Sequence, residues 1–193
     1  MKKYISFIVL SGVVVFTVFL YIDNHRQPAA ETVDEIIDKE ELYAFGKDLN
    51  DVLSGTQMPD INCIDISGDS IKLSDLVTGE RVLALYYSEM HCSSCYEKQF
   101  DLLQHLPLDS TKLLVIGAHS SHRSFKFYWS RSSYSLPAYY IDYISLDWYA
   151  NKYFFPYFFI LDKDLTVSYF HVPDQKDVEK NKRYVLGVKN NFF

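Results

Sequence analysis

The sequence predicts an α/β domain with a partly parallel sheet, carried behind an N-terminal transmembrane helix. Two short apolar runs, 82–87 and 113–117, are each followed by a segment with helical periodicity. This alternation indicates a β–α–β–α unit whose strands are parallel and buried on both faces. An uncharged stretch near the N-terminus adds the membrane helix. The 193 residues leave room for one ordinary domain and this appendage.

The membrane helix is predicted over residues 1–22. Lys2 and Lys3 precede an uncharged run from Tyr4 to Ile22, which spans about 28 Å as a helix and so matches the hydrocarbon core of a bilayer. A cleaved signal peptide has a shorter apolar region and a nearby small-residue cleavage site. The two lysines favour a cytoplasmic N-terminus. We therefore expect an uncleaved single-pass anchor in the cytoplasmic membrane, with all residues beyond Asp23 on the periplasmic or extracytoplasmic side.

Residues 23–55 are expected to form a juxtamembrane linker and an amphipathic stalk helix. Thr32 and Glu35 fit a capping box at the start of this helix, and apolar residues then recur at near-helical spacing. The helix should end near Ser54 and Gly55. Its apolar stripe is expected to dock on the domain that follows.

The domain proper is predicted over residues 56–193, and its expected elements follow from local patterns. They are a hairpin over 61–73 with a turn at Ser67-Gly68-Asp69, buried strands at 82–87 and 113–117, helices at 93–106 and 122–132, an edge strand at 139–141, a short helix at 146–152, and a closing hairpin over 158–171. No element is predicted beyond Pro173.

Composition excludes one class of partner. The net charge is −6, and no basic stripe follows residue 26, so nucleic acid is not an expected ligand. The 48% of hydrophobic residues supply enough material for a packed core.

The strongest chemical signal is Cys92-Ser93-Ser94-Cys95, placed where a buried strand turns into a helix. At this spacing the first thiol lies at the helix start, where unpaired amides favour a thiolate, and the second lies one turn inward. A zinc site would require further ligands, and no second C-x-x-C exists. A purely structural bridge across two residues would stabilise little. The pair therefore indicates redox chemistry, and no metal or cofactor is expected.

Motifs in a fixed order surround this pair: Met58-Pro59-Asp60, a hairpin, Leu73-Ser74-Asp75-Leu76, a buried strand, C-x-x-C, and Phe155-Pro156 before the apolar strand 158–161. Over roughly residues 57–172 this order resembles the extracytoplasmic thioredoxin-like proteins of the TlpA/ResA type. The resemblance implies a thioredoxin-like fold, with a central mixed sheet flanked by helices and an N-terminal β-hairpin. It also implies disulfide exchange, with Cys92 as nucleophile, Cys95 as resolving thiol and Pro156 as a cis-proline facing the dithiol.

The sequence departs from that family beside the dithiol. His91 replaces the usual Trp, the intervening pair is Ser-Ser where a proline is more common, and Tyr86 falls where cytoplasmic thioredoxins carry a buried acid. A charged His91 would stabilise the Cys92 thiolate, and Glu89 would relay a proton, although a loop histidine and an exposed acid are the plainer interpretations. Phe155 is bulky for its position and is expected to narrow the choice of partners.

Cys63 and the histidines have plainer interpretations than site chemistry. Cys63 lies in an alternating strand pattern and is expected to be a small buried apolar residue. His119 and His122 form an H-x-x-H after the second strand, and His171 lies near the closing hairpin; loop histidines such as these are usually solvated.

Three function classes remain open at this point. The first is a membrane-anchored thiol–disulfide oxidoreductase, expected to act as a disulfide reductase, whose partners are extracytoplasmic protein thiols and disulfides and a membrane or periplasmic electron donor. The second is a copper chaperone of the SCO type, a family that uses C-x-x-x-C and a later histidine that region 154–156 lacks. The third is a binding module that keeps the fold and holds a partner on the tyrosines of 134–157.

Overall fold

The computed structural model describes residues 50–142 and 155–193, which all belong to one compact unit. The expected anchor, the linker, most of the stalk helix and the expected helix at 146–152 lie outside the described residues. Within the described part of the chain, no helix is long and apolar enough to cross a membrane.

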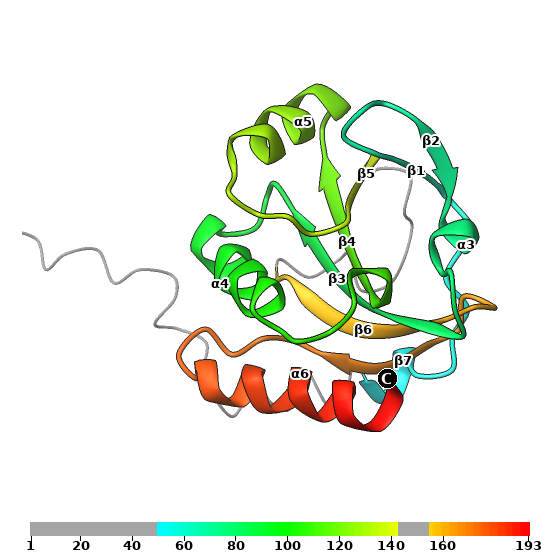
Figure 1. Ribbon diagram of the computed structural model, residues 1–193, viewed down its shortest axis with the longest axis vertical. Helices are drawn as coiled ribbons and strands as arrows, with labels where there is room; N and C mark the ends of the chain where they lie inside the picture. Colours follow the sequence, from blue (N-terminus) through cyan, green and yellow to red (C-terminus); the bar gives the residue numbers. More distant parts are fainter. Residues whose placement is uncertain (1–49, 143–154) are drawn as a thin grey trace, which may run out of the picture. The chain divides into compact units, whose positions relative to one another are not determined.

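A seven-stranded mixed sheet forms the centre of the domain (Figure 1), in the order β2-β1-β5-β4-β3-β6-β7. Strands β3 and β4 run parallel, as do β4 and β5, and the remaining pairs are antiparallel. The strands are β1 (Asn62–Ile64), β2 (Ser70–Lys72), β3 (Arg81–Ser88), β4 (Leu113–His119), β5 (Ala138–Asp142), β6 (Tyr157–Asp162) and β7 (Val167–His171).

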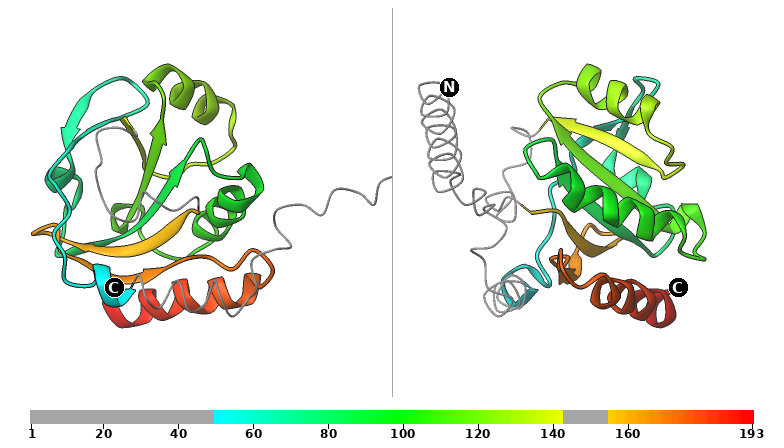
Figure 2. Two further views of the ribbon diagram at one scale, coloured as in Figure 1. Left: turned by 180° about the vertical axis from the view of Figure 1, so that it is seen from behind. Right: turned by 90° about the vertical axis from the view of Figure 1, so that its left-hand side faces the viewer.

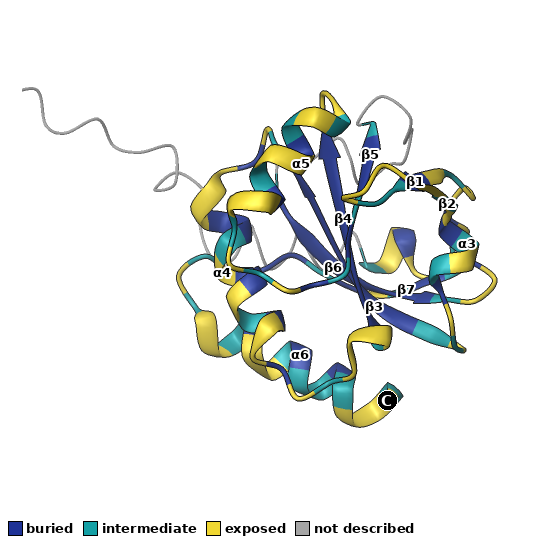
Figure 3. Cartoon of the chain, turned by 45° about the horizontal axis from the view of Figure 1, so that its top comes forward, coloured by how far each residue is buried: buried dark blue, intermediate teal, exposed yellow. Residues whose placement is uncertain are grey.

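Three long helices, α4, α5 and α6, cover one face of this sheet (Figures 1 and 2). The opposite face packs against α3 and the segment before β1, including Leu53 and Met58. Figure 3 shows the central strands β3, β4 and β6 buried and the helices exposed along their outer sides. The helices are α3 (Leu73–Leu76), α4 (Ser93–Gln104), α5 (His122–Arg131) and α6 (Val178–Phe192), with a 3-10 turn, η2, at Ser110–Lys112.

Strand β3 separates the two halves of the core. Because successive side chains of a strand point to opposite faces, Leu83, Leu85 and Tyr87 pack under the long helices, and Val82, Ala84 and Tyr86 pack on the other side. All residues from Val82 to Ser88 are buried. The prediction of a strand buried on both faces is confirmed.

An edge strand was expected at 139–141; the strand is present, but its expected place at an edge of the sheet is wrong. Strand β5 lies between β4 and β1, because Ile64 of the N-terminal hairpin pairs with Tyr140. The sheet edges are β2 and β7. Local pattern does not show this, because the pairing joins segments far apart in the chain.

Helix α6 was not predicted. It begins after Asp177, whose side chain accepts a hydrogen bond from the Lys180 amide, and it buries Asn181, Val185 and Val188 at helical spacing. Valine, asparagine and glycine have modest or low helix propensity, which hides this pattern in the sequence. Packing against β6 and β7 therefore determines the helix.

The stalk segment is described only at its end. Residues 50–53 are helical, and the helix stops at Ser54 and Gly55 as expected. Gly55 has φ +83°, the left-handed conformation that glycine adopts readily after a helix. The Gly55 amide then donates to the Val167 carbonyl, the Val167 amide donates to the Thr56 carbonyl, and Gln57 pairs with Thr166. The end of the stalk is therefore held along the start of β7.

A prediction follows from the contact between Tyr87 of β3 and Gly117, its partner on the adjacent strand β4. A Cβ at Gly117 would lie 2.7 Å from the Tyr87 hydroxyl and under 3 Å from its ring carbons. Gly117→Ala should therefore lower the free energy of unfolding by about 1–3 kcal/mol through overpacking. Gly187→Ala is the matched control on α6, where a Cβ meets nothing within 4 Å, and it should stabilise the helix by up to about 1 kcal/mol. Urea denaturation measures both, and equal effects would contradict the account.

Candidate active site

The candidate site lies where β3 ends and α4 begins. Residues 89–92 form the connecting loop, and Cys92 is the N-cap residue of α4. The parallel strands β3, β4 and β5 all have their carboxyl ends on this side of the sheet, which is where α/β folds place functional loops. The dithiol is therefore carried by a short loop on a rigid strand.

The three cysteines of the chain occupy three different environments. Cys92 is exposed, whereas Cys95 is only 6% exposed, one helical turn further on, and the two lie close together. The expected exposed first thiol and buried second thiol are confirmed. Cys63 is fully buried in β1, as expected, where burial and then the nearby Asp60 carboxylate raise the pKa of its thiol to about 12.

Cys92 contacts the second residue of its own helix. Its sulfur lies 3.0 Å from the Ser94 hydroxyl, and its side chain makes no capping hydrogen bond to the helix amides. The Cys95 amide instead donates to the Cys92 carbonyl at 2.9 Å. The hydroxyl of Ser94 is therefore a polar side chain in direct contact with the exposed thiol.

His91 is folded back into the loop. It is 8% exposed, and its Nδ1 accepts a hydrogen bond of 3.1 Å from the Ser88 amide, while its own amide donates to the Ser88 carbonyl. The ring also meets Tyr86 edge-on. An Nδ1 that accepts a hydrogen bond carries no proton, so this geometry fits a neutral imidazole. His91 thus clamps the loop that leads to Cys92.

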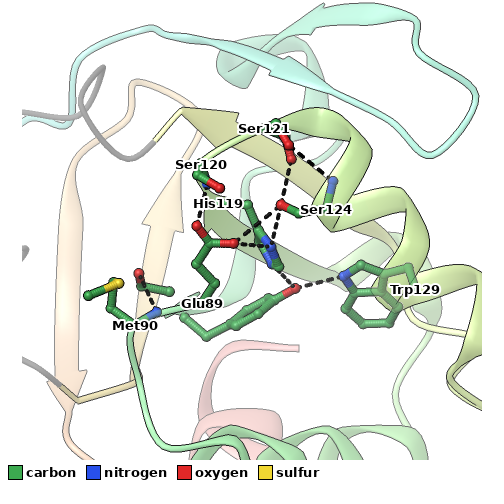
Figure 4. A network of polar contacts seen from close by, with 9 residues as sticks. Glu89, Met90, His119, Ser120, Ser121, Ser124 and Trp129 are labelled. Atoms are coloured by element: carbon green, nitrogen blue, oxygen red, sulfur yellow. Dashed lines mark hydrogen bonds and ion pairs between the residues drawn. The ribbon is translucent and has the colours of Figure 1, made fainter.

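Glu89 points toward the start of α5 (Figure 4). Its carboxylate accepts hydrogen bonds from the Ser120 amide at 2.6 Å and the Ser124 hydroxyl at 3.2 Å, and it pairs with Nδ1 of His119 at 3.2 Å. Burial alone would raise the pKa of Glu89, but the hydrogen bonds from Ser120, the adjacent His119 and Ser124 bring it below its ordinary value. Glu89 is therefore a carboxylate that ties the dithiol loop to β4 and α5.

His119 extends this network into the core (Figure 4). Its Nε2 lies 3.0 Å from the Tyr87 hydroxyl, which also accepts a hydrogen bond of 2.8 Å from Nε1 of Trp129. Burial lowers the pKa of His119 and raises that of Tyr87 well above its ordinary value. One arrangement satisfies every group: Trp129 donates to Tyr87, Tyr87 donates to neutral His119, and His119 donates to ionised Glu89.

The network is linked to the dithiol helix by aromatic packing. The Tyr87 ring packs against Tyr96, the residue after Cys95, and against Phe100, with ring centroids 4.8 and 5.1 Å apart. Sequence analysis did not predict the link between Tyr87, His119 and Trp129. Its members are up to 42 residues apart, and no local pattern joins them.

Phe155 and Pro156 lie beside the same end of β3. Tyr157 opens β6 opposite Tyr86, so the two preceding residues run past the point where the dithiol loop leaves the sheet. Pro156 is buried and Phe155 is partly buried. The described residues contain no cis peptide bond, so the Phe155–Pro156 bond is trans and the prediction of a cis bond is wrong. The trans form is the intrinsically preferred one for X–Pro bonds, and the sequence pattern alone does not override it.

His122 and His171, the other histidines considered in the sequence analysis, have structural partners. Nε2 of His122 lies 2.7 Å from the Asp65 carbonyl, and Nε2 of His171 lies 3.2 Å from the Asn181 side chain. His119 and His122 therefore serve separate contacts. Across residues 50–142 and 155–193, no three His, Cys, Asp or Glu side chains are grouped so that they could hold a metal ion.

Sheet order, helix placement and the loop position together define a thioredoxin-like fold, and solved structures agree. The chain is similar to a protein assigned as the thiol:disulfide interchange protein DsbE of Chlorobium tepidum, with a TM-score of 0.54 and 16% identity over 69% of this chain and 96% of that one. It is also similar to a protein assigned as a thiol-disulfide oxidoreductase of Bacteroides vulgatus, with a TM-score of 0.52 and 19% identity over 69% and 96% of the two chains.

An uncharacterised conserved protein of Geobacillus kaustophilus has a TM-score of 0.50 and 19% identity, over 63% of this chain and 69% of that one. No family model and no curated protein matches the sequence. At these identities the likeness shows the thioredoxin-like fold, and the chemistry of this chain has to be argued from its own residues.

Replacing Glu89 tests the network. Glu89→Gln keeps the shape but removes the charge that accepts from Ser120 and His119, so it should lower the free energy of unfolding by about 1–2 kcal/mol. Urea denaturation at pH 8 is the appropriate measurement, because His119 is then neutral in the folded and unfolded protein.

Glu80→Gln is the matched control, because Glu80 is an exposed acid just before the same strand. This variant should change stability by less than about 0.5 kcal/mol. An equal loss in the two variants would remove the structural role given to Glu89.

Proposed function

We propose that this chain is a thiol–disulfide oxidoreductase that exchanges disulfides with protein partners through Cys92 and Cys95. The observation that carries the proposal is the asymmetry of the pair: an exposed thiol at the helix start and a buried thiol one turn inward. The attacking thiol must reach the disulfide of a client protein, whereas the resolving thiol need only reach the sulfur of the attacking cysteine.

The exchange proceeds in two displacements. The Cys92 thiolate attacks one sulfur of a client disulfide, an S–S bond forms between Cys92 and the client, and the second client sulfur leaves as a thiolate that takes a proton. Cys95, as its thiolate, then attacks the Cys92 sulfur and releases the first client sulfur. The client gains two electrons and is reduced, while Cys92 and Cys95 are oxidised to a disulfide. A dithiol electron donor resets the pair by the same two steps.

The surroundings support this chemistry by fixing the loop. His91 clamps the loop internally through Ser88, and Glu89 joins it to β4 and α5. Met90, between them, is 69% exposed and offers apolar surface to a client beside the thiol. The TlpA/ResA type of family, with reduction of extracytoplasmic clients, is the finer assignment that the sequence motifs favour.

We further propose that the domain works outside the cytoplasmic membrane on a single-pass anchor at residues 1–22. Support comes from the uncharged Tyr4–Ile22 run behind Lys2 and Lys3. Its partners are then extracytoplasmic protein thiols and disulfides, and a membrane or periplasmic protein supplies the electrons.

Substitution of each cysteine tests the exchange. Cys95→Ser should accumulate mixed disulfides between Cys92 and client proteins, because the resolving thiol is missing, whereas Cys92→Ser should form none. The acceleration of insulin reduction by dithiothreitol should be lost in Cys92→Ser. Cys63→Ser is the control and should retain activity, because that thiol is buried and its pKa is raised to about 12. Equal trapping by the Cys92 and Cys95 variants would contradict the assignment.

Fractionation tests the anchor. The full-length protein should remain in the membrane after alkaline carbonate extraction, and its intact mass should include residues 1–22, because a helix across the bilayer is held by its apolar surface. A variant that begins at Asp23 should be released. A mature N-terminus near residue 30 would overturn the proposed anchor and leave the exchange chemistry unaffected.

A further inference from the structure

The Ser94 hydroxyl is placed against the reacting sulfur of the dithiol. Ser94 is the second residue of α4, and its Oγ lies 3.0 Å from Sγ of Cys92. We propose that Ser94 is a catalytic residue of the exchange reaction, which donates a hydrogen bond to the Cys92 thiolate and so sets both its reactivity and the reduction potential of the pair. This inference rests on the proposed function and deepens it.

The local backbone explains why a side chain takes this role. Cys92 has φ −57° and ψ 124°, and its sulfur makes no capping hydrogen bond with the amides of the first turn. The Cys95 amide is occupied by the Cys92 carbonyl at 2.9 Å. A hydroxyl two residues after the cysteine reaches the sulfur from the same turn, where a proline would have no donor to offer.

The strength of this contact depends on the state of the sulfur. In the thiol either atom can donate, but a thiolate has no hydrogen, so the Ser94 hydroxyl must donate to it. A hydrogen bond to a charged acceptor is about twice as strong as a neutral one. Once Cys92 is joined to Cys95, the sulfur is uncharged and accepts weakly. The hydroxyl therefore stabilises the Cys92 thiolate more than it stabilises the thiol or the disulfide.

Two consequences follow from that preference. A stabilised thiolate is populated at lower pH, so more of Cys92 is reactive near neutrality. Stabilising the reduced form also makes the disulfide a stronger oxidant. Titratable groups near the sulfur include the Cys95 thiol, one helical turn away, and Tyr96, whose pKa is raised by burial, then by Glu97 and then by Cys92. His91, the preceding residue, is held by Ser88. They are the same in every variant compared below.

The test compares side chains of matched shape at residue 94. Ser94→Thr keeps the hydroxyl. Ser94→Val has the shape of threonine without a hydroxyl, and Ser94→Ala lacks both the hydroxyl and the extra methyl groups. Ser93→Ala is the neighbouring control, because Ser93 is also exposed and no hydrogen bond from it to Cys92 is present among the described residues. The rate of iodoacetamide alkylation of Cys92 in the reduced full-length protein is followed from pH 5 to 10 by mass spectrometry. The 16 tyrosines would obscure the thiolate absorbance at high pH.

Ser94→Val and Ser94→Ala should both move the alkylation midpoint to higher pH and lower the thiolate fraction at neutral pH by about three- to tenfold. Ser94→Thr and Ser93→Ala should keep the wild-type midpoint. Equilibration with glutathione above the midpoint should show the Val and Ala variants shifted toward their disulfide by the same factor, where tenfold corresponds to about 30 mV.

An unchanged midpoint in Ser94→Val, or an equal shift in Ser93→Ala, would overturn the role of Ser94. The alkylation midpoint is measured without any client. A wild-type protein that fails to reduce insulin but shows the Ser94-dependent midpoint would therefore count against the proposed function, and with it the catalytic role of Ser94, while the hydrogen bond from Ser94 to the thiolate would stand.

Discussion

The rest of this structure depends on the complete burial of strand β3. Its two neighbours, β4 and β6, occupy both hydrogen-bonding edges, and both faces are covered by the core. A strand in this position can carry no functional side chain toward solvent along its length. Chemistry has to begin where the strand stops, at Ser88, and the dithiol loop begins there. Burial of β3 therefore positions the candidate site before any catalytic residue is considered.

The same burial places the hydroxyl of Tyr87 in the core, where the network around it supplies the hydrogen bonds that it needs. A tyrosine hydroxyl in a core costs free energy unless it is hydrogen-bonded. Tyr87 finds partners in His119, at the end of β4, and in Trp129, on α5. His119 in turn requires a partner for its other nitrogen, and Glu89 supplies it from the dithiol loop. Satisfying one buried hydroxyl thus joins three elements beside the dithiol.

Sequence analysis predicted the parts of this molecule that are governed by local patterns. The runs 82–87 and 113–117, the turn at Gly68 and the helix after Cys92 have strong signals, and the structure has strands, a turn and a helix there. The resemblance to thioredoxin-like proteins added the fold. Helix α6 and the interior place of β5 were missed, because packing against distant segments decides both of them.

The candidate site shows the same division. A motif at the end of a buried strand identified Cys92 and Cys95 and predicted that Cys92 is exposed and Cys95 is buried. The roles of Glu89 and His91 did not, because each depends on the direction in which a side chain leaves the loop. Glu89 turns toward Ser120 and His91 turns toward Ser88, and both choices are determined by hydrogen-bond donors that the sequence does not place in space.

The three cysteines show how one side chain can serve different purposes within a single domain. Burial at Cys63, with Asp60 nearby, disfavours the thiolate and leaves a small apolar core residue. Cys95 is buried too, but it lies one helical turn from an exposed thiol, so it has a sulfur to attack. Cys92 alone combines exposure with a hydroxyl against its sulfur. Cys92 therefore differs from the other two cysteines both in access and in the hydroxyl against its sulfur, and the hydrogen bonds of His91 and Glu89 hold the loop that carries it.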